Sequence, residues 1–212
     1  MRYEIIPVSP LQQNCSVVWN LDTKIGALID PGGNADRLLD AIKNHQLKIE
    51  KILVTHPHVD HVGAVSELAQ TLDVPIIGPH RDDQFWIDNL ATQSQLFGVP
   101  CSGVFKPQQW LEQGDQVDVG NLCFDVYHCP GHTPGHVVFV ENTHKIAFVG
   151  DVLFKGSIGR TDFPKGDHAT LLRSIRDRLW SLDDTIAFVP GHGSMSTIGE
   201  EKHSNPFVGD EA

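Results

Sequence analysis

The sequence predicts an α/β protein in which two packed β-sheets carry helices on their outer faces. The order of elements favours this class, because strands come first, helices then alternate with strands, and further strands precede a last helix and strand. Hydrophobic residues make up 40% of the 212 residues, which is ordinary for a chain with a full core. No stretch has the composition of a linker, so residues 1–212 are expected to form a single domain.

The first half of the chain contains five apolar or alternating runs that are typical of strands. They lie at residues 3–8, 14–19, 26–30, 51–54 and 74–78. The third run ends at Pro31-Gly32-Gly33, which is a strong turn signal. A helix capped by Asn34 or Asp36 is expected next, with aliphatic residues at positions 38, 39, 42 and 47 on one face. A second helix is expected from Val62, with apolar positions 65, 68, 69 and 72 turned inward.

Residues 80–113 allow two interpretations. Large apolar residues at positions 85, 86, 90, 96 and 97 indicate helical packing. The segment would form either a lid over a site or an ordinary amphipathic helix on the core. Beyond it, strands are predicted at residues 116–119, 122–126, 137–140, 146–149 and 185–189. Asp167 is placed to cap one more helix.

The charge and the cysteines exclude several classes of function. A formal net charge of −11 argues against non-specific binding to nucleic acid or to an acidic membrane. Four cysteines without a Cys-x-x-Cys pair favour reduced thiols and a cytoplasmic protein over a disulfide framework. The N-terminus lacks the apolar core of a signal peptide, and no apolar run approaches the ~20 residues of a membrane helix.

The strongest functional signal is the run Thr-His-Pro-His-Val-Asp-His at residues 55–61. It lies between a predicted strand and a predicted helix, in a loop where several side chains can converge. His56 and His58 are two residues apart, so an extended loop can bring both to one ion. Asp60 and His61 follow as the chain turns into the helix, which favours a second ion next to the first. The alternative, four solvated polar residues, does not explain so many histidines in so short a run.

Three later residues share one setting, because each follows a predicted strand and has a glycine beside it. They are His132, Asp151 and His192. Glycine lets the backbone approach an ion closely. Each residue alone would more often be an ordinary hydrogen-bonded loop residue. Together with residues 55–61 they indicate a metal centre built from imidazole and carboxylate ligands.

The order of these motifs resembles the signature of the metallo-β-lactamase superfamily. It reads Thr-His-x-His-x-Asp-His, Pro-Gly-His-Thr-x-Gly-His, Gly-Asp and Pro-Gly-His-Gly. Within the superfamily the chain is most similar to short, YcbL-type members of the glyoxalase II branch, and residues 159–164 and 205–207 add to that likeness. The resemblance covers nearly the whole chain. It implies an αββα four-layer sandwich, with two mixed sheets flanked by helices and the metals at one edge, and no C-terminal helical domain.

The resemblance also implies a role for each candidate ligand. One ion would be held by a first trio, His56, His58 and His132, and a second ion by a second trio, Asp60, His61 and His192, with Asp151 bridging both. Two divalent ions are expected, zinc first, with iron or manganese as alternatives because the same ligands accept them. His136 is expected to lie beside the ligands without being one.

The activity implied by the resemblance is hydrolysis of a thioester, S-D-lactoylglutathione or a related hydroxyacylglutathione. A hydroxide bridging the two ions would attack the carbonyl carbon, with Asp60 and Asp151 as the catalytic carboxylates. The positive charge left on the loaded site would attract a small anionic thioester. Arg160 is a candidate substrate-binding residue and equally a loop-pinning arginine. Asp162 and Ser194 stand where glutathione-binding relatives carry tyrosines.

Three alternatives to this hydrolase stay open. A persulfide dioxygenase of the same fold would hold one iron with the first trio and Asp151, which leaves the second trio unexplained. A lactonase or another ester hydrolase would use the same centre. A non-catalytic metal-binding module conflicts with seven ligands, since structural zinc is usually closed and four-coordinate. In each case the chain is expected to act as a monomer or a small homo-oligomer, without nucleic-acid or membrane partners.

Overall fold

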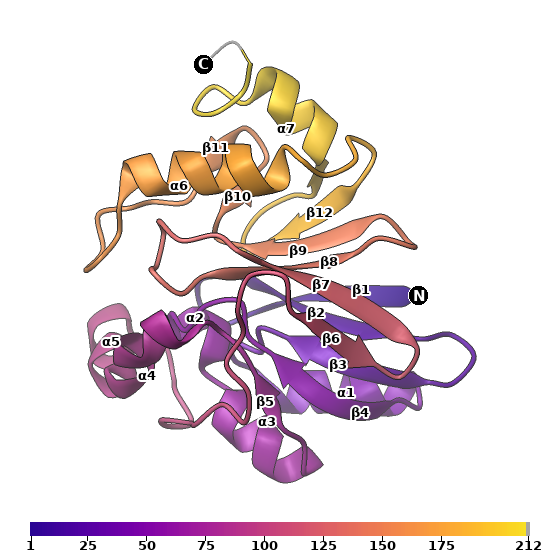
Figure 1. Cartoon of the computed structure of the whole chain (residues 1–212). Helices are drawn as coiled ribbons and strands as arrows, with labels where there is room; N and C mark the ends of the chain where they lie inside the picture. The colour runs from indigo at the N-terminus through magenta and orange to yellow at the C-terminus, as the bar shows by residue number, and fades with distance from the viewer. Residues whose placement is uncertain (211–212) are drawn as a thin grey trace.

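The computed structural model describes residues 1–210, and its two β-sheets lie face to face with helices on both outer faces (Figure 1). The first half of the chain forms one sheet with its helices, and the second half forms the other. This arrangement confirms the predicted sandwich of two mixed sheets.

The first sheet contains five strands in the order β1-β2-β3-β4-β5. They are β1 (Arg2–Val8), β2 (Gln13–Trp19), β3 (Ile25–Ile29), β4 (Lys48–Leu53) and β5 (Ile76–Ile77). The first three pair antiparallel. From β3 to β5 the strands are parallel, because helices α1 (Ala35–Asn44) and α3 (Val65–Leu72) lie on the crossovers between them. All five strands overlap the apolar runs of the sequence.

The second sheet contains six strands in the order β13-β12-β9-β8-β7-β6. They are β6 (Gln116–Val119), β7 (Leu122–His128), β8 (Val137–Glu141), β9 (Ile146–Gly150), β12 (Ala187–Pro190) and β13 (Ser196–Thr197). The neighbours β9 and β12 are parallel, and the other pairs are antiparallel. A small hairpin follows β9 and consists of β10 (Leu153–Phe154) and β11 (Ser157–Ile158).

Two helices cover the outer face of the second sheet (Figure 1). They are α6 (His168–Ser174), which continues as the π-helical turn η2 (Ile175–Leu179), and α7 (Ile198–Ser204). The Asp167 side chain accepts a hydrogen bond from the Thr170 N–H at 2.7 Å, so it caps α6 as predicted.

Alternate residues of a central strand serve two different cores, which explains why such strands are apolar throughout. In β8, Val137 and Phe139 belong to the core between the two sheets. Val138 and Val140 belong to the core between the second sheet and α6. Burying a side chain such as Phe139 contributes roughly 1.5–3 kcal/mol, so both faces of the strand stabilise the sandwich.

The segment before β6 forms three short helices, η1 (Arg81–Asp83), α4 (Gln84–Asp88) and α5 (Leu90–Phe97). Trp86 and Leu90 are buried, as the apolar pattern predicted. Leu96 and Phe97 lie in a helix, as the apolar pattern indicated, but they are 74% and 41% exposed and do not belong to the buried core. Both lie in the last turn of α5, whose end faces solvent.

The helix predicted from Val62 is also different in the structure. It is divided into α2 (Val59–Val62) and α3, with Gly63 between them. Gly63 lies so close to the carbonyl oxygens of Gly32 and Pro100 that a Cβ atom there would collide with both. The division leaves Asp60 and His61 in a separate helical turn next to the loop of His56 and His58.

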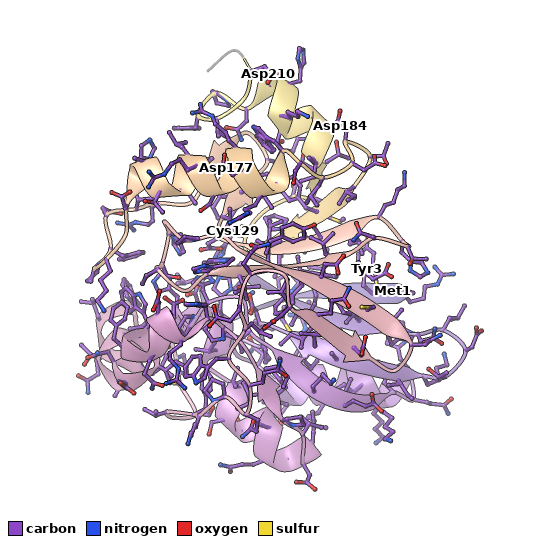
Figure 2. The ribbon with its side chains drawn as sticks, viewed as in Figure 1. Met1, Tyr3, Cys129, Asp177, Asp184 and Asp210 are labelled. Carbon is purple, nitrogen blue, oxygen red and sulfur yellow. The ribbon has the colours of Figure 1, made fainter. Side chains whose placement is uncertain are left out.

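The cysteines are free thiols and do not form a reactive centre. Cys129 lies beneath α6 on the outer face of the second sheet (Figure 2). Burial raises the pKa of its thiol to about 12, so Cys129 acts as a small apolar residue, and Cys15 is equally buried. Within residues 1–210, no helix combines the length and the apolar character needed to cross a bilayer.

Candidate metal centre

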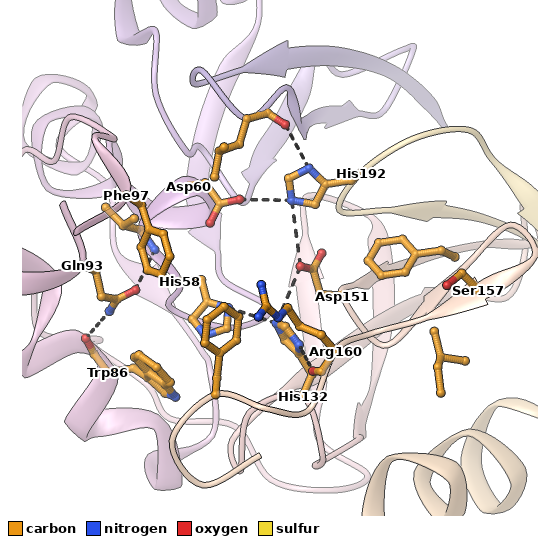
Figure 3. Close-up of a pocket in the computed structure, with 15 residues that line it drawn as sticks. His58, Asp60, Trp86, Gln93, Phe97, His132, Asp151, Ser157, Arg160 and His192 are labelled. Atoms are coloured by element: carbon orange, nitrogen blue, oxygen red, sulfur yellow. Dashed lines mark hydrogen bonds and ion pairs between the residues drawn. The ribbon is translucent and has the colours of Figure 1, made fainter. Parts of the chain in front are cut away.

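Residues from both halves of the chain converge at one edge of the sandwich. They come from the loop after β4, from α2, and from the loops after β7, β9 and β12. The carboxyl ends of β7, β9 and β12 lie at the same edge, because β9 and β12 are parallel and β8 separates β7 from β9 by two antiparallel pairings. Figure 3 shows His58, Asp60, His132, Asp151 and His192 around one pocket. The topology therefore brings together the positions that the motifs singled out.

The first trio is a buried cluster of three imidazoles. The His58 Nδ1 atom lies 3.2 Å from His56 Nε2 and 3.0 Å from His132 Nε2. One nitrogen from each ring can therefore face a single ion. Burial lowers the pKa of all three rings below the usual histidine value, so each ring is neutral at neutral pH and one of its nitrogens offers a lone pair. Neutral imidazoles are the form that binds a metal.

The second trio lies next to the first, and Asp151 stands between them. His192 Nε2 lies 3.1 Å from Asp60 Oδ2. Asp151 Oδ1 lies 3.3 Å from His61 Nε2, and Asp151 Oδ2 lies 3.6 Å from His132 Nε2. Burial opposes the charge of Asp151, but the neighbouring imidazoles hold its pKa well below the usual range. Asp151 is therefore an anion within reach of both trios.

The protein leaves atoms of this cluster without partners, which fits a bound cation. In the described residues, His61 Nε2 and Asp151 Oδ1 are buried, and apart from their approach to each other at 3.3 Å neither has a partner. Such atoms are costly unless a ligand satisfies them. Gly191 borders both, and a Cβ atom there would collide with Asp151 Oδ1 and the His61 ring. The glycine keeps this space open, so the donor set fits metal ions.

Several residues outside the two trios orient their rings. Asp30 accepts hydrogen bonds from the Thr55 N–H at 2.7 Å and the Thr55 hydroxyl at 2.6 Å. Its Oδ2 also lies 2.9 Å from His61 Nδ1, which leaves Nε2 of that ring to face Asp151. The His136 ring stacks on the ring of His56, and its Nε2 accepts a hydrogen bond from the Asp151 N–H at 3.1 Å. His136 thus lies beside the cluster with one nitrogen already used.

The sequence motifs did not indicate the role of Asp30. A signal for it existed, because Asp30 is the last residue of the strand predicted at residues 26–30 and precedes Pro31-Gly32-Gly33. That is the same strand-to-glycine setting that singled out His132, Asp151 and His192.

A cavity of about 540 Å³ opens over the two trios (Figure 3). Its walls are mainly apolar, and they include Trp86, Phe97, Phe154 and Phe163. The Trp86 ring meets the His58 ring edge to face, with centroids 4.7 Å apart. Trp86 therefore covers one side of the His58 ring.

Arg160 lines this cavity, but its charge is already paired. Its guanidinium donates to both carboxylate oxygens of Asp162 at 2.6 Å and lies 4.3 Å from the centre of the Phe163 ring. Its carbonyl oxygen accepts a hydrogen bond from His132 Nδ1 at 2.7 Å. The main chain of Arg160 thus orients a ring of the first trio, a role that the sequence did not indicate.

Comparisons with known proteins agree with this fold. A family model described as the metallo-beta-lactamase superfamily matches residues 8–192, which contain all seven candidate ligands. The chain is 49% identical over 209 residues to hydroxyacylglutathione hydrolase GloC of Haemophilus influenzae, with 98% of each protein covered. Among solved structures, BLEG-1 B3 metallo-beta-lactamase aligns with a TM-score of 0.91 at 37% identity, over 98% of this chain and 99% of that one. TTHA1623 in a di-iron-bound form aligns with a TM-score of 0.88 at 36% identity, over 97% and 100%.

Proposed function

The chain belongs to the metallo-β-lactamase superfamily and is a metal-dependent hydrolase, and we propose on that premise that it cleaves the thioester of a hydroxyacylglutathione such as S-D-lactoylglutathione. The observation that carries the proposal is the pair of trios with Asp151 between them. The likeness to a hydroxyacylglutathione hydrolase supports the choice of substrate. Four free cysteines suit the reducing cytoplasm, where we place the reaction.

We assign two ions to the centre. The first would be held by His56 Nε2, His58 Nδ1 and His132 Nε2, the second by the second trio, and Asp151 would contact both. Imidazole and carboxylate donors suit zinc, which we propose first, and they also accept iron and manganese. When bound, the ions would supply a water activated at neutral pH and an electrophile for the carbonyl oxygen.

The chain's own groups would position the reactants. Asp60 directs one carboxylate oxygen, Oδ2, to His192. We assign its other oxygen to the attacking water, whose proton it would accept and whose lone pair it would direct at the thioester carbon. A thiolate leaves without help from an acid, so the mechanism requires no proton donor on the opposite side. The aromatic walls of the cavity would keep bulk water away from the reacting carbon.

The experiment that tests this function measures release of free thiol from S-D-lactoylglutathione. Purified chain loaded with zinc, iron or manganese should release one thiol per thioester bond cleaved, and a His58→Ala variant treated identically should not. If none of the three loaded forms releases thiol above the variant, the assignment of the thioester fails.

A lactonase or another ester hydrolase is the second candidate, and the cavity is the observation that favours it. Apolar side chains such as Leu11 and Phe97 line the cavity, and both are large exposed hydrophobic residues. Glutathione carries two carboxylates, whereas the one arginine in the cavity lining, Arg160, is already paired with Asp162. Faster turnover of a neutral lactone than of lactoylglutathione would favour this second function.

Replacing Arg160 by alanine should have a small effect on the thioester reaction. The Arg160 and Asp162 side chains are 61% and 65% exposed, and exposed pairs contribute little. We expect the KM for lactoylglutathione to rise by roughly fivefold at most, with kcat unchanged, because the carbonyl that orients His132 is retained. Steady-state kinetics measure both values. An Asp162→Asn control should release the guanidinium and lower KM, and a large loss of kcat in Arg160→Ala would contradict the expectation.

A further inference from the structure

The helical segment of residues 80–97, called the clamp segment below, contacts both loops that carry the first trio. It comprises η1, α4 and α5 and packs beside α2 at one end of the sandwich (Figure 1). The sequence left open whether these helices form a lid. Their contacts with the two loops are buried hydrogen bonds, which a lid that opens would have to break.

At its beginning the clamp segment holds the loop of His132. Asp83 is fully buried, and its carboxylate accepts hydrogen bonds from the Thr133 hydroxyl and the Gly135 N–H, both at 2.7 Å. The His80 N–H donates to the Gly135 carbonyl at 3.0 Å. A Cβ atom on Gly135 would collide with Asp83, so the loop and the segment are in direct contact. The residue next to His132 is therefore fixed by a side chain far from it in sequence.

Near its end the clamp segment holds the loop of His58. Gln93 is buried, and its Oε1 accepts a hydrogen bond from the Val59 N–H at 3.0 Å. Its Nε2 donates to the carbonyl of Trp86 at 2.8 Å and to that of Pro57 at 3.4 Å. Pro57 and Val59 are the two neighbours of His58, so one amide side chain holds the backbone on both sides of that ligand.

The side chains of Asp83 and Gln93 are polar, so burying them costs free energy unless they form hydrogen bonds. Both direct hydrogen bonds at the two loops. Burial raises the pKa of Asp83 to about 7, which is the mark of a carboxylate removed from water. An apolar side chain would be easier to bury, but it could not hold the two donors of the His132 loop. Without Asp83 or Gln93, polar groups of the loops would stay buried without hydrogen bonds. The loop concerned would then have to move for these groups to find new partners.

We propose that Asp83 and Gln93 are positioning residues that together set the distance between the His58 loop and the His132 loop. The clamp segment is then a rigid brace for the first trio and not a lid. The brace keeps His58 Nδ1 and His132 Nε2 at their separation of 3.0 Å, ready for one ion. The inference rests on the proposed role of these histidines as ligands, but it does not depend on which ester the protein cleaves.

The test measures zinc affinity of the metal-free full chain by competition with a chromophoric chelator, without any substrate. Gln93→Met keeps the size of the side chain and removes its hydrogen bonds. Thr133→Val removes the donor to Asp83 without changing a buried charge. Each should weaken zinc binding by about tenfold or more, as loss of outer partners of metal ligands does. The double variant should be weakened little beyond the more severe single variant, because releasing either loop already abolishes the fixed distance.

Controls on the same elements separate positioning from general destabilisation. Asp82→Asn and Gln84→Met change exposed side chains of the clamp segment, and Thr133→Ser keeps the hydroxyl. All three should bind zinc within roughly twofold of the wild-type affinity. Affinities are measured well below the melting temperature of each metal-free variant. If Gln93→Met does not fold, the Thr133→Val and Thr133→Ser pair decides alone.

Two results would contradict the proposal that the clamp segment positions the two loops. One is wild-type zinc affinity in both Gln93→Met and Thr133→Val. The other is a double variant whose loss is the sum of the two single losses, because the loops would then be held independently. Failure of the lactoylglutathione assay would leave the zinc measurements unaffected, so the two proposals can fail separately.

Discussion

An Asp151→Asn variant is expected to lose thioester hydrolysis almost completely, with kcat/KM reduced by roughly a thousandfold or more. Within residues 1–210, Asp151 is the one carboxylate paired with histidines of both trios, through Oδ1 towards His61 and through Oδ2 towards His132. Asparagine has the same shape but no charge, and its amide nitrogen cannot bind a cation. One ion would therefore lose a ligand, and the pair would lose the anion that lies between them.

The measurement is kcat/KM for lactoylglutathione together with the number of ions bound per chain. A matched control is Asp184→Asn, which neutralises an exposed carboxylate beside Lys202, outside the cavity lining. That variant should keep wild-type activity. An Asp151→Asn protein that still binds two ions and retains most of its activity would show that Asp151 does not bridge them.

The sandwich could be predicted from sequence because its strands are read directly from apolar runs. In β8 and β9 every residue is buried, so the strands stand out as continuous apolar segments. The helical region before β6 was harder to predict, because apolar residues indicate a helix but do not show which of its turns another element covers. The exposure of Leu96 could not be predicted for that reason. The need for glycine at position 63 depends on the nearby carbonyl oxygens of Gly32 and Pro100, and no local pattern contains that information.

The candidate ligands could be predicted from sequence because they lie in short motifs. The residues that hold the ligand loops in place could not be predicted in this way. Each candidate has a distinctive residue type next to glycine or another ligand, so the linear sequence carries the signal. Asp83 and Gln93 act on loops that are distant in sequence, and a buried aspartate or glutamine has no motif of its own. Such partners emerge only when the fold places donors and acceptors together.

Removal of metal should abolish hydrolysis. When zinc is added back, activity should rise as the second equivalent per chain binds. Seven donors are too many for one tetrahedral ion, so the first equivalent should fill one trio and leave the reaction incomplete. Metal-free chain should also melt at a lower temperature, because an ion at about a thousand times its Kd stabilises the folded state by about 4 kcal/mol. Chelation, dialysis and stepwise addition of zinc provide the measurement.

A His192→Ala variant makes the same experiment decisive between the hydrolase and the persulfide dioxygenase. His192 belongs to the second trio and is 3.1 Å from Asp60, whereas the first trio and Asp151 do not require it. In a binuclear hydrolase this variant should bind one ion tightly and lose thiol release. In a mononuclear iron enzyme it should keep its one iron and its oxygen uptake with glutathione persulfide. Full thioester activity with a single ion per chain would contradict the binuclear proposal, because the second trio would then have no part in the chemistry.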